Sequence, residues 1–124
     1  MSYQKLEQHQ QQLHRLSHLS AICGWDQAAM MPEGGNEARA EAMAELGVLI
    51  HGKRTAPELG DWIARAESEP LDEVQRANLG EIKRQWQDAS LLPGELVEAL
   101  SLAGSKCEHA WRSQRKHNDW AGFA

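Results

Sequence analysis

Hydrophobic residues recur along almost the whole chain at the three- and four-residue steps of an α-helix. The first such segment runs from about Ser2 to Ala29, and its opposite face carries a run of glutamines. Its apolar edge consists of Leu6, Leu13, Leu16, Leu19 or Ser20, and Cys23. Pro32 ends this segment, because proline has no amide hydrogen and pushes the preceding residue out of the α region. A first helix roughly 40 Å long is therefore predicted.

A second helix is predicted after the turn at Gly34 and Gly35. Asn36 is suited to be its N-cap, and Glu37 lies near the positive end of its dipole. Gly52 marks the end of this helix. The buried face is expected to consist of Ala42 or Met43, Leu46, Leu49 and Ile50.

Three more helices complete the pattern. A short third helix follows Thr55 or Pro57, a fourth runs from about Leu71 to Ala89, and a fifth begins at Pro93 and reaches Trp120. The inward residues of the third and fourth are expected to be Leu59, Trp62, Ile63, Ala66, Val74, Leu79, Ile82 and Trp86. Those of the fifth are expected to be Leu96, Leu100, Ala103, Cys107, Ala110 or Trp111, and Gln114.

The predicted fold is all-α: an antiparallel bundle of about five helices, two of them long. Composition agrees, because strand-forming residues are scarce and Ala, Leu, Glu, Gln and Arg are abundant. The 124 residues are the size of one domain. Five tryptophans are many for such a bundle; Trp62 and Trp86 are expected in the core, whereas Trp111 and Trp120 fit either a core or a contact with another domain.

Charge and hydropathy argue against several classes of function. The net charge is −5, and the 13 basic residues are scattered among 18 acidic ones, so a nucleic-acid partner is not expected. No segment approaches the roughly 18 consecutive apolar residues of a membrane span. The start of the chain lacks the apolar segment of a signal peptide. Cys23 and Cys107 are expected to be buried thiols, and the protein is expected to be cytoplasmic.

The six histidines do not form a recognisable catalytic motif. None belongs to a His-Glu-x-x-His sequence, in which two imidazoles bind zinc and the glutamate activates water. His14 and His18 are one helical turn apart and could bind a metal, although a solvated face is the preferred interpretation. Cys107 and His109 are two residues apart on a helix and do not face each other. No catalytic or metal-binding residue is therefore predicted within this chain.

The segment from Trp25 to Arg39 is the most distinctive part of the sequence. A Trp-Asp pair near the end of one helix is followed by Met-Pro, two glycines and an arginine on the next helix. Asp26 and Arg39 are expected to form a salt bridge that joins the two helices, with Trp25 as its hydrophobic cover. The residues that carry this pattern, and its continuation along the second helix, are Trp25, Asp26, Met31, Pro32, Gly35, Arg39, Leu46 and His51. This succession resembles the N-terminal signature of the M32 metallocarboxypeptidases, the carboxypeptidase Taq family.

The resemblance implies that residues 1–124 are the N-terminal helical cap region of a longer carboxypeptidase. Members of this family are cytoplasmic, mostly helical, often homodimeric enzymes that use zinc or cobalt to remove C-terminal residues from peptides with broad specificity. Their metal-binding and catalytic motifs would lie beyond these residues, so the chain alone is expected to be inactive. The signature residues are then expected to have a structural role.

Two other interpretations remain open. A free-standing helical bundle that binds another protein is suggested by the heptad-like edges of the first and fifth helices and by the surplus of tryptophan. A small metal-binding bundle that uses His14 and His18 is the third hypothesis.

Overall fold

The computed structural model describes all residues from Met1 to Ala124 and contains helices but no strand. The elements are α1 (Ser2–Ala29), η1 (Glu33–Gly35, a 3-10 turn), α2 (Asn36–Arg54), α3 (Glu58–Ala66), α4 (Glu73–Ser90), α5 (Gly94–Lys116) and α6 (Trp120–Phe123). The all-α prediction is confirmed, and α1 and α5 are the two longest helices.

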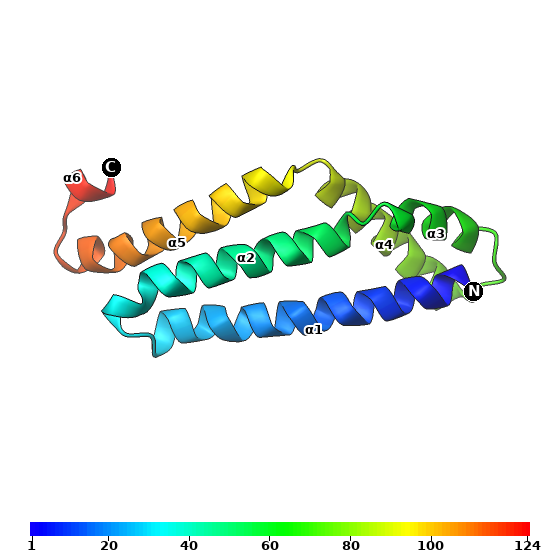
Figure 1. Cartoon of the computed structure of the whole chain (residues 1–124), viewed down its shortest axis with the longest axis horizontal. Coiled ribbons are helices and arrows are strands. Elements are labelled where there is room, and N and C mark those ends of the chain that lie inside the picture. Colours follow the sequence, from blue (N-terminus) through cyan, green and yellow to red (C-terminus); the bar gives the residue numbers. More distant parts are fainter.

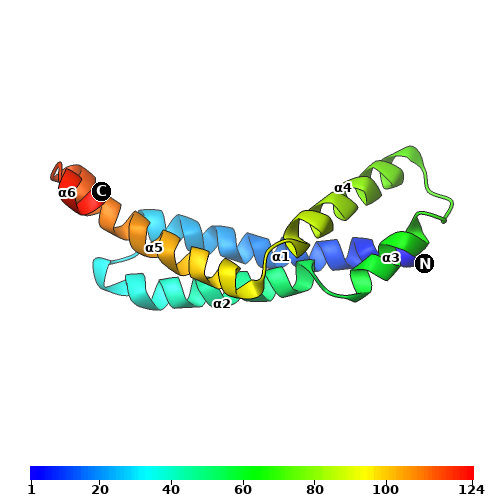
Figure 2. The ribbon, with the colours of Figure 1, turned by 90° about the horizontal axis from the view of Figure 1, so that it is seen from above.

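The helices form an elongated bundle (Figure 1). α1 and α2 make an antiparallel hairpin, and α5 lies along α2. The contact between α2 and α5 is more extensive than that between any other two elements. α3 and α4 gather at the opposite end, near the N-terminus, and α4 leans away from the long helices (Figure 2). The molecule therefore has one end that is a three-helix layer and one end where shorter helices cover the start of α1.

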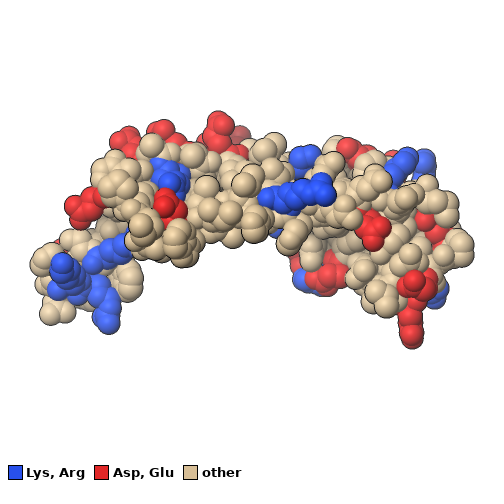
Figure 3. Space-filling view, turned by 90° about the horizontal axis from the view of Figure 1, so that it is seen from below, with Lys and Arg blue, Asp and Glu red and all other residues tan.

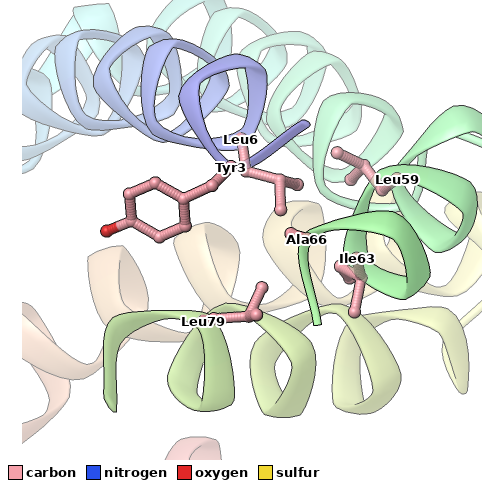
Figure 4. Close-up of a cluster of buried hydrophobic side chains, with 6 residues drawn as sticks. All are labelled: Tyr3, Leu6, Leu59, Ile63, Ala66 and Leu79. Atoms are coloured by element: carbon pink, nitrogen blue, oxygen red, sulfur yellow. The ribbon is translucent and has the colours of Figure 1, made fainter. Parts of the chain in front are cut away.

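The largest buried apolar cluster lies at the end of the bundle near the N-terminus (Figure 4). It consists of Tyr3, Leu6, Leu59, Ile63, Ala66 and Leu79, and the half-buried Trp62 and Trp86 pack against it as expected. Gly60 on α3 allows this packing, because a Cβ at that position would lie 3.2 Å from the ring of Trp86. The core thus joins α1, α3 and α4.

Glu69 caps the beginning of α1. Its carboxylate accepts hydrogen bonds from the backbone amides of Ser2 (2.6 Å) and Tyr3 (3.2 Å). These amides have no partner within the helix, and a negative charge is favourable at a helix N-terminus. The segment between α3 and α4 is thereby fixed to the start of the chain, a contact across 67 residues that no local pattern reveals.

Several of the predicted helix ends are wrong in detail. α2 continues past Gly52 to Arg54, and α5 begins at Gly94 with Pro93 as its N-cap. Asn36 is the first residue of α2 rather than its N-cap, because η1 places Gly35 in that position. α4 begins at Glu73 instead of Leu71, since the side chain of Asp72 caps it. α5 ends at Lys116, because Asn118 adopts a left-handed conformation (φ 53°) and breaks the helix before Trp120.

Several predicted inward residues are exposed. Leu49 on α2 and Val74 on α4 point to solvent, and the close approach of α1 and α5 to α2 instead buries the small side chains of Ala40 and Ala44. On α5 most of the predicted inward face is exposed, only Ala110 and Gln114 of it are half-buried, and the buried residue is Ser105. Cys107, expected to be a buried thiol, is exposed, whereas Cys23 is half-buried; both are free. Periodicity located the apolar face of α5 but not the side on which α2 lies.

An exposed ion-pair network on α4 gives a pH-dependent prediction. Arg84 donates to both carboxylate oxygens of Glu81, at 3.0 and 2.5 Å, and Gln85 donates to one of them at 3.0 Å. The hydrogen bonds from Arg84, and then that from Gln85, lower the pKa of Glu81 from 4.5 to about 2. A carbon-detected NMR titration of the Glu81 carboxyl is expected to have its midpoint below 4.5. Because water screens this exposed pair, its contribution to the free energy of unfolding is expected to be small.

The sign of the pH effect follows from the direction of this shift. Because the pKa of Glu81 is lower in the folded chain, its contribution to stability is complete above pH 4.5 and is lost as the pH falls through about 2. Arg84→Ala is expected to return the NMR midpoint of Glu81 towards 4.5. An unchanged midpoint in this variant would show that Arg84 is not the cause.

Candidate functional site

The corner between α1 and α2 contains most of the residues singled out by the sequence. The amides of Met30 and Met31 both donate to the carbonyl of Asp26, at 2.9 and 2.8 Å, which closes the last turn of α1. Pro32 is extended, and η1 follows. Gly35 avoids a tight contact, because a Cβ there would lie 3.2 Å from Cγ of Met31. The backbone therefore reverses direction within six residues, from Met30 to Gly35.

Arg39 joins the two helices that meet at this corner. Its Nη2 donates to Oδ2 of Asp26 at 2.6 Å, and its Nη1 donates to the carbonyl of Cys23 at 3.0 Å. The side chains of Arg39 and Asp26 are 26% and 33% exposed, so the pair is only partly screened by water. The predicted salt bridge is present, and the second hydrogen bond adds a direct contact with the backbone of α1.

The expectation that Trp25 covers this ion pair is wrong. Its side chain is 63% exposed, because it lies on the face of α1 turned away from α2. The buried residue at the corner is Gln27, whose Nε2 donates to Oδ1 of Asn36 at 3.3 Å. Its backbone carbonyl accepts a hydrogen bond from Nη1 of Arg112 at 2.5 Å, which connects α5 to the same corner.

Sequence reasoning missed Gln27 and Arg112 as members of this corner. Gln27 continues the edge formed by Ser20 and Cys23, seven and four residues earlier, so its inward position could have been inferred. No comparable signal marks Arg112, which is separated from Gln27 by 85 residues. Only the packing of α5 against α2 brings the two together.

His51, the last residue of the signature, lies away from the corner, near the other end of α2. Its Nε2 donates to the carbonyl of Leu92 at 2.7 Å and so fixes the loop between α4 and α5. Leu46 is half-buried between these two places. The signature is thus divided between the α1–α2 corner and a contact that positions the start of α5.

The remaining candidates do not come together as a metal site. His14 and His18 are exposed on α1, and Cys107 and His109 lie on α5. No three His, Cys, Asp or Glu side chains gather in a way that could hold a metal ion. The hydrogen bonds at the corner connect α1 with α2 and with α5.

None of the helices is both long enough and apolar enough to cross a lipid bilayer.

Comparisons with known proteins agree with this architecture. The sequence profile of the carboxypeptidase Taq (M32) metallopeptidases matches residues 5–124. Thermostable carboxypeptidase 1 of Thermus thermophilus is 36% identical over 126 residues, which cover 98% of this chain and 25% of the relative. This chain therefore belongs to the M32 metallopeptidase family.

Solved structures show the same helical unit. Metallocarboxypeptidase 1 of Trypanosoma cruzi is 40% identical and superposes with a TM-score of 0.77 over 98% of this chain. A carboxypeptidase of Pyrococcus furiosus is 25% identical, with a TM-score of 0.76 over 99% of this chain. In both cases the chain spans 25% of the length of the structure that it matches.

Proposed function

We propose that this chain is the N-terminal helical cap region of a metal-dependent carboxypeptidase and is inactive alone. One observation carries the proposal: the chain matches M32 proteins along almost its whole length but spans only 25% of theirs. The peptide substrate, the zinc or cobalt ion and the catalytic residues would then belong to the rest of the enzyme.

The corner and the core support this role. The Arg39–Asp26 ion pair, the Arg112–Gln27 hydrogen bond and the His51–Leu92 hydrogen bond each connect different helices or loops. Such contacts between different elements suit a region that supports the rest of an enzyme. Broad specificity, a homo-oligomeric assembly and a cytoplasmic location are parts of the same proposal that the family resemblance suggests.

The proposal is tested by comparing the isolated chain with a full-length chimera. In the chimera, this chain replaces the matching quarter of the Thermus thermophilus relative. Both proteins are assayed with a blocked dipeptide and added zinc or cobalt. We expect release of the C-terminal residue by the chimera and none by the isolated chain, because the metal ligands lie outside these residues.

The unsubstituted Thermus thermophilus protein is the positive control for folding and metal loading. Metal-dependent hydrolysis by the isolated chain would contradict the proposal. A folded chimera that binds metal but has no activity would also contradict it, because a cap region of this family is expected to support catalysis.

A further inference from the structure

α5 carries an exposed apolar seam, which we define as Leu96, Leu100, Ala103, Cys107 and Trp111. All five residues are exposed. They follow steps of four, three, four and four residues, so they form one face about 22 Å long. The opposite side of α5 faces α2 and buries Ser105, with Val97 and Ser101 half-buried on the same side. The more apolar face of this helix is therefore turned away from α2, and α6 lies beside its C-terminal end at Trp111.

The chain as a whole exposes more surface than a globular protein of its size. Its accessible surface is 8679 Å², whereas a monomeric protein of 13.9 kDa is expected to have about 6,700 Å². The excess is therefore about 2,000 Å². One chain contributes about 800 Å² to an interface of standard size, so a second copy bound through such an interface would leave most of the excess uncovered. A partner larger than a second copy of this chain accounts better for the excess accessible surface.

The surroundings of the seam fit a helix. An open groove of about 740 Å³ runs beside the N-terminal half of α5, and Val97 and Leu100 line it together with Ile50 and Ala89. The spacing of the seam is the one that interdigitates with a neighbouring helix. None of the five seam residues is charged, although Arg54 and Asp88 are also among the residues that line the groove. On the side of α1, a group of Lys and Arg side chains lies at the end where α5 terminates (Figure 3).

We infer that the seam is a docking face for an apolar helix from the part of an M32 enzyme that this chain does not span. This inference rests on the proposed function. It is supported by the relatives, in which the same helical unit makes up 25% of a longer chain. Docking would cover the exposed leucines and Trp111 and would use the hydrophobic effect to hold the cap region against the body of the enzyme.

Cys107 provides a direct probe because its thiol lies within the seam and is exposed. Its rate of alkylation is measured by mass spectrometry in the isolated chain and in the full-length chimera described above. We expect alkylation of Cys107 to be at least about tenfold slower in the chimera, since a covered thiol reacts slowly. Cys23, which is half-buried in the corner of this chain, is the internal control and should react at a similar rate in both proteins.

Two leucine substitutions test which face of α5 takes part in docking. Leu100→Asp changes the seam, where Leu100 is 59% exposed, and Leu102→Asp makes the same change at an exposed leucine two residues further along, on a different side of the helix. In the chimera, Leu100→Asp is expected to restore fast alkylation of Cys107, and Leu102→Asp to leave it slow. Circular dichroism of the isolated chain should show unchanged helicity for both variants.

The outcomes separate the docking face from the proposed function. An active chimera in which Cys107 reacts as fast as in the isolated chain would overturn the docking face and leave the proposed function intact. An inactive chimera with a protected Cys107 would support the docking face and contradict the function. Protection of Cys107 in the isolated chain at high concentration would assign the seam to a second copy. An insoluble chimera would also count against docking if the Thermus thermophilus protein itself folds.

Discussion

Replacing Leu6 by alanine is expected to lower the free energy of unfolding by about 2–5 kcal/mol. Leu6 is 0% exposed and lies at the centre of the cluster that joins α1 to α3 and α4 (Figure 4). The substitution removes apolar contacts and leaves a cavity that the surrounding helices can only partly close. With so few fully buried side chains in the chain, this loss would be a large fraction of its stability.

The measurement is a urea titration followed by circular dichroism at 222 nm. Leu19→Ala is the matched control, because it is the same change on the same helix at a position that is 54% exposed, and it should change the stability by no more than about 0.5 kcal/mol. Similar losses for both variants would show that the cluster is not the main core.

Arg39→Ala is expected to destabilise the chain by on the order of 1–3 kcal/mol. The variant loses the 2.6 Å contact with Asp26 and the 3.0 Å hydrogen bond to the carbonyl of Cys23. The partly buried carboxylate of Asp26 is left without its charged partner, which is costly in such surroundings. The carbonyl of Cys23 loses one hydrogen bond but can still accept from the helix of which it is part. Amide hydrogen exchange should become faster first at the α1–α2 corner, since Arg39 joins those helices.

The control for this prediction is Arg84→Ala. Arg84 also forms ion pairs, with Glu81 and Asp88, but they lie on the exposed face of a single helix. Such pairs contribute little, so the expected change is within about 0.5 kcal/mol at neutral pH. Equal effects of the two substitutions in a denaturant titration would mean that the corner ion pair is no more important than a surface pair.

Helix positions were predictable because each helix depends on signals within a few residues. Pro32 and the Trp25–Gly35 segment defined the end of α1, and Ala29 is its last residue as expected. The errors arose where a distant or unusual local contact intervened. The η1 turn displaced the N-cap from Asn36 to Gly35, and the left-handed Asn118 ended α5 early.

The packing direction of α5 was not predictable from its sequence. Periodicity identified the apolar face of this helix, and the simplest assumption placed that face inward. The structure turns it outward, because α5 meets α2 through small residues such as Ser105, which let the two backbones approach closely. An apolar face indicates that its burial against a partner is favourable. It does not identify that partner as a neighbouring helix of the same domain.

The sequence by itself determined the helical class, the positions of the helices, the ion pair at the α1–α2 corner and the resemblance to M32 enzymes. These follow from local spacing and from residues close together in the chain. Tertiary structure alone decided that Glu69 caps α1, that Arg112 reaches Gln27, and that the seam of α5 is exposed. The reason is physical: each of these depends on the packing of helices distant in sequence, and no local pattern contains that information.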